Sequence, residues 1–495
     1  MLEEIKRLLK HATIYGLGNV LGKVVGFVMI PFYTHYLKPA DYGTLELLDL
    51  SLTLTTLILT MWLNASLVRH YNDFADRRNQ NEAVSTILIF AFAVGVIVTC
   101  AGIRFARPLA ALILNDSDLY RYVVLESWAF LLSTLNVVCI SYLRARQRSS
   151  LVVGTGLVSL FLSLLLNIYF IAILHIGVLG VLYSNLISSV LITLPLTVQT
   201  IRQVQLRFSL QKLRGIISFG TPLIITSAAA FTLNFSDRFF LRHFSTISDV
   251  GLYALGYKFG FMLSLLVVQP FDMIWQARIY EIAKQENVGA TFARLFEYYC
   301  FVLAATGLAL SICIKEILSV LTTPEFHMAY RVVPVVALAY VFQGANRFFL
   351  AGAYIAKKTM PLGPVGLISA STNIGLNLLL IPRFGMMGAA WATAISFCIM
   401  SALSYAVSQR VFPIPYVFSR VTGAICLAVL IYLLSNVLAL TSVSLQVVVK
   451  LTLLAAFPAV LFSVGFFNKD EVARSKGVTQ AILRRYGLLR PAVPE

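Results

Sequence analysis

The sequence predicts an all-α polytopic membrane protein with 14 transmembrane helices, in which two parallel six-helix lobes enclose a V-shaped central cavity and two further helices follow. Three observations predict this fold. Of the 495 residues, 59% are hydrophobic and 12% are charged, about half the charged share of soluble domains. Apolar runs of membrane-spanning length recur along the chain, and the first part of the sequence is repeated later. This composition excludes a soluble globular protein and a disordered chain.

Each apolar run is rich in Leu, Ile, Val, Phe and Ala and is about the length that a helix needs to cross a bilayer. The runs lack the alternation of β-barrel strands, and a helix satisfies its own backbone groups in lipid. The predicted spans lie near residues 13–33, 43–66, 83–103, 120–143, 151–174, 177–199, 216–241, 250–275, 295–314, 329–350, 360–381, 386–408, 417–439 and 443–467.

Basic residues set the predicted orientation. The formal net charge is +17, but most Lys and Arg residues lie between apolar runs, which indicates membrane topology and excludes nucleic acid as the partner. With a cytoplasmic N-terminus, 26 of the 39 basic residues fall on the cytoplasmic side, nine on the opposite side and four inside spans. We therefore expect both termini in the cytoplasm and an even number of spans.

An internal repeat relates the two parts of the chain. Residues 32–43 read FYTHYLKPADYG and residues 240–251 read FLRHFSTISDVG, so that Gly43 pairs with Gly251 at an offset of 208. The same offset pairs Gly177 with Gly385. This offset spans six helices, so the two copies have the same orientation.

The repeat predicts three parts: a six-helix lobe at 1–205, a second at 206–410, and residues 411–495 with helices 13 and 14 and a cytoplasmic tail. Transporters built from parallel repeats bind substrate between their lobes. The alternative is a repeat that serves only as a packing scaffold.

Charges inside the spans are the candidate site, because a charge at the bilayer centre costs about 2.5–3.5 kcal/mol and usually faces a wet cavity or a partner. The basic candidates for a cationic cavity that binds substrate are Lys23, Lys258, Arg347 and Arg238. The candidates for ion coupling or for pairing with these charges are Glu46, Asp49, Glu126, Asp237 and Asp272.

An alternative interpretation is purely structural. Lys258 then pairs with Glu46 or Asp49 of a neighbouring helix, and Arg347 and Arg238 reach out of the membrane from span ends. The sequence leaves both interpretations open.

Motifs of enzymes are missing. The chain has no GxxxxGK[ST] and no HExxH, and its histidines and cysteines have no metal-ligand spacing. We therefore expect a non-enzymatic protein without cofactor or metal. A membrane-embedded enzyme is a rival, but such enzymes need a sizeable extramembrane region, and the longest predicted periplasmic link, near 104–119, has about 16 residues.

Two segments, YGLGNVLGKVVGFVMIPFYTHYLKPADYGTLELL and FGMMGAAWATAIS, carry a family resemblance. With the six-plus-six-plus-two arrangement, the sequence resembles the polysaccharide-transporter (Wzx-type oligosaccharide flippase) branch of the multidrug/oligosaccharidyl-lipid/polysaccharide exporter superfamily. The resemblance implies a bacterial inner-membrane flippase that moves an undecaprenyl-diphosphate-linked oligosaccharide to the periplasmic leaflet for O-antigen, capsule or exopolysaccharide assembly.

The same resemblance implies several partners: the lipid-linked oligosaccharide, membrane lipids, a polysaccharide polymerase with its chain-length machinery, and coupling to H⁺ or Na⁺. A membrane-embedded polysaccharide polymerase is one alternative function, and a multidrug or cation antiporter of the superfamily is another. Its expected mark is a compact anionic ion site in one lobe.

Overall fold

The computed structural model describes residues 18, 22, 25–438 and 443–467. These residues form helices joined by short connections, and none of them lies in a β-strand. Lys23 lies outside the described residues.

The α-helices follow one another along the chain and cover the predicted spans, in places with several further residues at the ends. They are α2 (Pro39–Thr56), α3 (Trp62–Asp73), α4 (Arg77–Arg104), α5 (Ala106–Leu114), α6 (Tyr120–Ala145), α7 (Ser149–Asn167), α8 (Gly177–Val204), α9 (Leu210–Phe235), α10 (Asp237–Phe244), α11 (Ile247–Leu263), α12 (Gln269–Ile282), α13 (Val288–Leu321), α14 (Val333–Phe349), α15 (Ala351–Ile355), α16 (Leu362–Val411), α17 (Phe418–Val437) and α18 (Val443–Ser463). π-Helical turns join some of them, among which Leu57–Met61 links α2 to α3 and Ser264–Val268 links α11 to α12.

Twelve helices of the described chain are long and apolar enough to cross a membrane, counting α2–α3, α11–α12 and α14–α15 each as one. One of the twelve, α16, is a hairpin and not a straight rod. Gly385 has φ 53° and ψ −130°, and the Asn373 side chain donates a hydrogen bond to Ser396 Oγ across the turn, at 3.3 Å. Its two arms therefore supply two crossings. Residues 25–36, also helical, belong to the first predicted span, so the predicted all-α polytopic fold is confirmed.

Backbone geometry repeats along with the sequence. Gly177 and Gly385 both have positive φ, 56° and 53°, a region that glycine tolerates because it has no Cβ. The π-turns at Leu57–Met61 and Ser264–Val268 occupy matching places after α2 and α11. The Tyr-Arg pairs at 120–121 and 330–331 are 210 residues apart. This second offset aligns α6 with α14, whereas 208 aligns α2 with α11.

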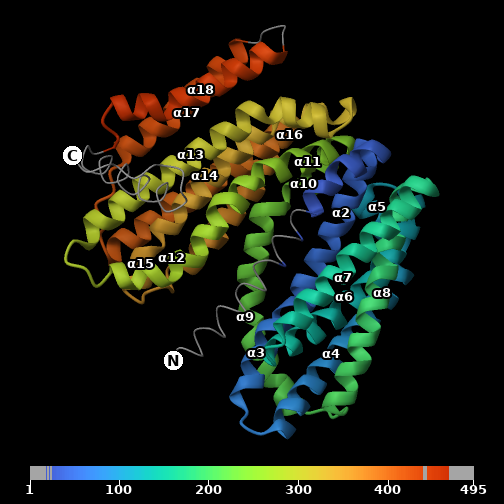
Figure 1. The fold of residues 1–495 in the computed structure, drawn as a ribbon. Helices are drawn as coiled ribbons and strands as arrows, with labels where there is room; N and C mark the ends of the chain where they lie inside the picture. Colours follow the sequence, from blue (N-terminus) through green and yellow to red (C-terminus); the bar gives the residue numbers. More distant parts are fainter. Residues whose placement is uncertain (1–17, 19–21, 23–24, 439–442, 468–495) are drawn as a thin grey trace, which may run out of the picture.

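Two groups of helices form the body of the molecule. In Figure 1, helices α2 to α8 (blue to green) and α10 to α16 (green to orange) meet around α2, α10 and α11 and diverge toward the opposite end. We call them the first group and the second group. Helix α9 lies between them, because it contacts α3 and α4 as well as α16. Helices α17 and α18 pack on α13, outside both groups.

The tightest approach of the two groups is the crossing of α2 and α11, which are in extensive contact. The repeated glycines meet there. A Cβ on Gly43 would overlap the carbonyl oxygen of Ile247, and a Cβ on Gly251 would overlap that of Pro39. Only glycine lets the two backbones approach so closely at this point.

Candidate functional site

A polar cavity of about 460 Å³ lies where the two groups of helices face each other. Most of its wall comes from α2, α6, α7 and α8 of the first group, and α11 of the second group contributes one lysine. The charged groups on this wall are Glu46, Asp49, Glu126 and Lys258. The described wall therefore holds three carboxylates and one ammonium.

Lys258 projects from α11 into this cavity, and 49% of its side chain is exposed. Its ammonium donates a hydrogen bond to the Tyr42 hydroxyl at 2.8 Å and lies 3.5 Å from the Glu46 carboxylate. A capping box fixes the start of α11, in which Thr246 and Asp249 bond each other's backbone N–H groups. Lys258 thus reaches across from the second group to α2 of the first.

Glu46 is the centre of a charge bridge between the groups of helices. One carboxylate oxygen lies 3.5 Å from Lys258 Nζ, and the other lies 3.7 Å from Arg238 Nε. Its side chain is 13% exposed. A carboxylate held between two cations of the opposite group favours contact between α2 and α11.

The other two carboxylates on the cavity wall, Asp49 and Glu126, also belong to the first group. Asp49 comes one helical turn after Glu46 on α2, and Glu126 lies on α6. In the part of the chain that the structure describes, Glu126 Oε2 is buried without a hydrogen-bond partner. Such an oxygen retains its capacity to accept a hydrogen bond from a ligand or a water in the cavity.

Arg238 and Asp237 form a buried pair inside the second group. Arg238 donates to Asp237 at 2.7 Å, and both side chains are 2% exposed. The guanidinium carbon lies 3.9 Å from the centre of the Tyr257 ring. Asp237 also accepts hydrogen bonds from Tyr253 and Thr393. With these partners, Arg238 is a packed element of the second group and not part of the cavity wall.

Arg347 and Asp272 form a third ion pair, 3.1 Å between Nε and the carboxylate. They lie on α14 and α12, and neither lines the cavity. The Trp275 indole donates to the backbone carbonyl of Arg347 at 3.3 Å. The described sequence candidates thus fall into three sets. Glu46, Asp49, Glu126 and Lys258 line the cavity, Asp237 and Arg238 form a buried pair, and Asp272 and Arg347 form a separate pair.

Some lining residues were not among the sequence candidates. Tyr42 lies in the repeated LKPADYG segment, which signals only a helix start, and its hydroxyl turns out to hold Lys258. The remaining polar wall consists of uncharged side chains, namely Ser133, Ser159, Ser163, Asn185, Ser188 and Ser189. Serine in a membrane helix is common as a helix–helix contact, so its sequence signal is weak.

The fold and the cavity define a class: a multi-pass membrane protein in which two helix groups enclose a polar chamber. The sequence model of the family described as "Polysaccharide biosynthesis protein" matches residues 34–331. The chain belongs to this family. This match confirms the predicted resemblance at the level of a polysaccharide-biosynthesis family.

Two relatives come from Haemophilus influenzae. The chain is 25% identical over 293 residues to "Lsg locus putative protein 1", covering 57% of this chain and 68% of the relative. It is 23% identical over 265 residues to an "Uncharacterized membrane protein", covering 53% of this chain and 62% of that relative. The second match thus spans less than two thirds of the relative's length.

Solved structures share the fold. The "Lipid II flippase MurJ, inward closed conformation" matches with a TM-score of 0.75 and 11% identity, over 91% of this chain and 99% of that one. An inward-facing multidrug resistance MATE family transporter of the MOP superfamily matches with a TM-score of 0.62 and 13% identity, over 81% and 94% of the two chains. At these identities the likeness concerns the fold.

Proposed function

We propose that this protein flips an undecaprenyl-diphosphate-linked oligosaccharide from the cytoplasmic to the periplasmic leaflet of the bacterial inner membrane, for polysaccharide biosynthesis. The observation that carries the proposal is the polar cavity between the two groups of helices, into which Lys258 projects with half of its side chain exposed. A polar chamber with a half-exposed cation on its wall suits an anionic headgroup on a lipid.

We assign Lys258 the role of binding the diphosphate. A lysine attracts phosphate as a point charge with three donors, and Tyr42 adds a hydroxyl beside it. The predicted partner from the other lobe is Lys23. Glu46 competes for the same ammonium, so the arriving diphosphate displaces the Lys258–Glu46 contact.

Alternating access follows from the same contacts. We propose that residues 1–205 and 206–410 move as two lobes, with 411–495 attached to the second, and that both termini are cytoplasmic. The crossing of α2 and α11 at Gly43 and Gly251 then closes the periplasmic end. Loss of the Lys258–Glu46 contact weakens this closure, which couples binding of the headgroup to opening.

The membrane potential is a sufficient driving force. One elementary charge crossing the membrane is worth about 2.3 kcal/mol per 100 mV. A diphosphate with about two negative charges, moved toward a positive outside, gains up to about 4–5 kcal/mol at that potential.

Cation-coupled antiport is the second candidate, and one observation favours it. Asp49 and Glu126 line the same cavity, and Glu126 Oε2 has no hydrogen-bond partner within the described chain. Carboxylates of this kind can carry H⁺ or hold Na⁺. Flipping in sealed vesicles separates the two candidates, because flipping that ignores both pH and Na⁺ gradients contradicts antiport.

The test of the proposed function replaces Lys258 by Ala and by Arg. We expect Lys258→Ala to lower flipping at least about tenfold, since a hydrogen bond to a charged group is worth about 1.5–3 kcal/mol. Lys258→Arg keeps the positive charge and should keep most of the activity. The measurements are surface polysaccharide and the leaflet in which the lipid-linked precursor accumulates.

Lys450 provides the matched control. It is a second intramembrane lysine, on α18, and forms an ion pair with Glu316 away from the cavity. Lys450→Ala should leave flipping within about twofold of the unchanged protein, because neither Lys450 nor Glu316 lines the cavity. Full activity of Lys258→Ala at normal expression would refute the proposed role of this lysine.

A further inference from the structure

A second cavity of about 400 Å³ opens inside the first group of helices, between α6, α7 and α8. It shares Ser133, Ser159 and Ser189 with the cavity that holds Lys258. The two spaces therefore adjoin and share part of their wall. We call the second space the furrow. It runs along α6 from Ser133 to Arg144, about 16 Å at the rise of an α-helix.

The furrow differs from the first cavity in its chemistry. Its polar wall consists of uncharged hydroxyl and amide groups, namely Ser133, Asn136, Thr155, Ser159, Ser189 and Thr193. Among its described lining residues the one charged side chain is Arg144, at the end of α6. Carboxylates are confined to the first cavity. A wall of neutral donors and acceptors suits a ligand that is itself neutral and rich in hydroxyls.

Several of these polar groups are available to a ligand. Over the described residues, the Ser133 and Ser189 hydroxyls have no partner within the protein, and both line the two spaces. Asn136 donates its amide to Thr193 at 3.2 Å, which orients the amide and leaves its oxygen free to accept. Polar groups at membrane depth are costly unless water or a ligand satisfies them.

Helix α7 leaves the furrow open because it carries glycine there. Gly156 lines the furrow, and a Cβ added to it would meet no atom within 4 Å. Gly154, two residues earlier on the same helix, is also free of neighbours within 4 Å but does not line the furrow. A larger side chain at Gly156 thus fills the furrow without displacing the protein.

We infer that the furrow binds the glycan of the lipid-linked substrate, with its hydroxyl and amide wall bonding the hydroxyls of the sugars. The inference rests on the proposed function, since it places the sugars next to a diphosphate held at Lys258. The sugars then extend along the furrow, from Ser133 and Ser189 toward Arg144. Recognition of the glycan falls to the first group of helices alone.

The test compares two lipids bound to the full chain in lipid nanodiscs. One is undecaprenyl diphosphate, and the other is the undecaprenyl-diphosphate-linked oligosaccharide extracted from membranes of the cells that produce the protein. Native mass spectrometry of mixtures gives the preference for the glycolipid over the bare lipid. Ser133→Ala with Ser189→Ala should reduce this preference about tenfold, as expected for two lost hydrogen bonds.

The glycine pair supplies a test by volume. Gly156→Leu should bring the preference close to one while binding of undecaprenyl diphosphate persists, and Gly154→Leu should retain the preference of the unchanged protein. Leucine is the better helix former at both positions, so both variants should fold. Equal behaviour of the two leucine variants would overturn the inference.

The outcomes also separate the furrow from the proposed function. If the unchanged protein binds both lipids equally, the furrow does not bind the glycan and the proposed function stands. If it binds neither lipid, the proposed function fails and the inference fails with it.

Discussion

Equivalent positions of the repeat have opposite surroundings in the two groups of helices. In the first group, Asp49 and Glu126 line a cavity of about 460 Å³. Their counterparts at offsets of 208 and 210 are Tyr257 and Val336 in the second group, and these side chains are 3% and 0% exposed. The same backbone plan thus supports a hollow, polar interior in one group and a filled interior in the other.

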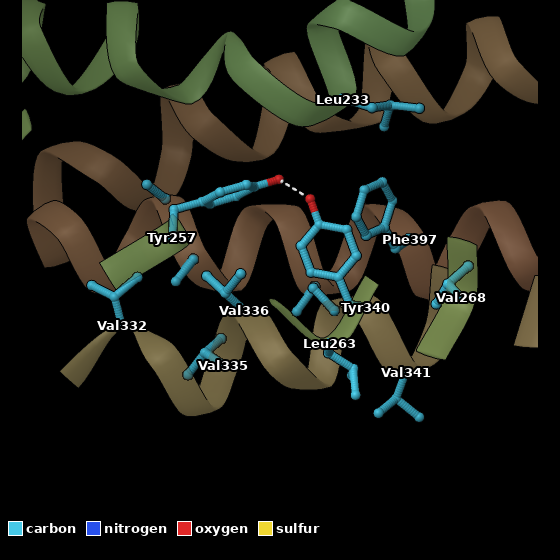
Figure 2. Close-up of a cluster of buried hydrophobic side chains, with 14 of the residues drawn as sticks. Leu233, Tyr257, Leu263, Val268, Val332, Val335, Val336, Tyr340, Val341 and Phe397 are labelled. Carbon is cyan, nitrogen blue, oxygen red and sulfur yellow. Dashed lines mark hydrogen bonds between the residues drawn. The ribbon is translucent and has the colours of Figure 1, made fainter. Parts of the chain in front are cut away.

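Figure 2 shows the filled interior: Tyr257 and Tyr340 point toward each other among Val336, Leu263 and Phe397. Their hydroxyls are 2.8 Å apart and hydrogen-bonded. Two buried charges of the second group, Asp237 and Arg238, pair with each other. We expect the second group to move as a rigid unit and the first group to hold the substrate.

The largest expected effect comes from breaking the buried ion pair of the second group. Arg238→Met leaves Asp237 buried without its cation, which costs about 3–5 kcal/mol in the free energy of unfolding. Unfolding of the detergent-solubilised protein by heat or by SDS measures the loss. The double variant Asp237→Asn with Arg238→Met removes the orphaned charge and should recover part of it. A single variant within about 1 kcal/mol of the unchanged protein would contradict a rigid second group.

The next-largest effect comes from replacing Glu126 of the first group by valine, the residue at the equivalent position 336 of the second group. Glu126→Val removes a carboxylate whose Oε2 lacks a hydrogen-bond partner in the described residues, so the protein should unfold no more easily and gain up to about 1–3 kcal/mol. Flipping should fall about tenfold, because the cavity wall loses one charge-assisted contact to the substrate.

The reciprocal variant is the control for this exchange. Val336→Glu places a carboxylate at a site that is 0% exposed, which should destabilise the protein by several kcal/mol. Equal effects of Glu126→Val and Val336→Glu on unfolding would show that the two groups of helices do not differ in this way.

The smallest effect concerns one hydroxyl. Tyr340 corresponds to Phe130 in the first group, at an offset of 210. Tyr340→Phe removes the hydrogen bond to Tyr257 and should cost about 1 kcal/mol of unfolding free energy. Flipping should be unchanged, because Tyr340 does not line the cavity. A transport defect without a change in stability would show that this interior participates in the transport cycle.

The spans could be predicted from the sequence because hydropathy is a local property. Even the hairpin of α16 was predicted as two runs, 360–381 and 386–408. The partners of the intramembrane charges could not be fixed in this way. Pairing of Lys258 with Glu46 was one of two open interpretations, and the structure shows that this lysine both pairs and faces the cavity.

The position of Arg238 shows why the rest could not be predicted. A charge near a span end predicts a side chain that faces either the central cavity or water outside the membrane. Arg238 does neither, because it is buried and its guanidinium packs against the ring of Tyr257. That outcome depends on how α10 packs against α11, which no local pattern encodes. The furrow is similar, because Ser133 and Ser189 come together only when α6 and α8 pack side by side.

The central claim is that water and substrate enter the first group of helices and not the second. The direct test introduces cysteine at equivalent positions, Glu126→Cys and Val336→Cys, and treats intact protein in vesicles with a small charged thiol reagent. Peptide mapping by mass spectrometry distinguishes the new thiol from the six native cysteines. We predict rapid modification at position 126 and protection at position 336. Equal modification at the two positions, or protection at position 126, would contradict the account.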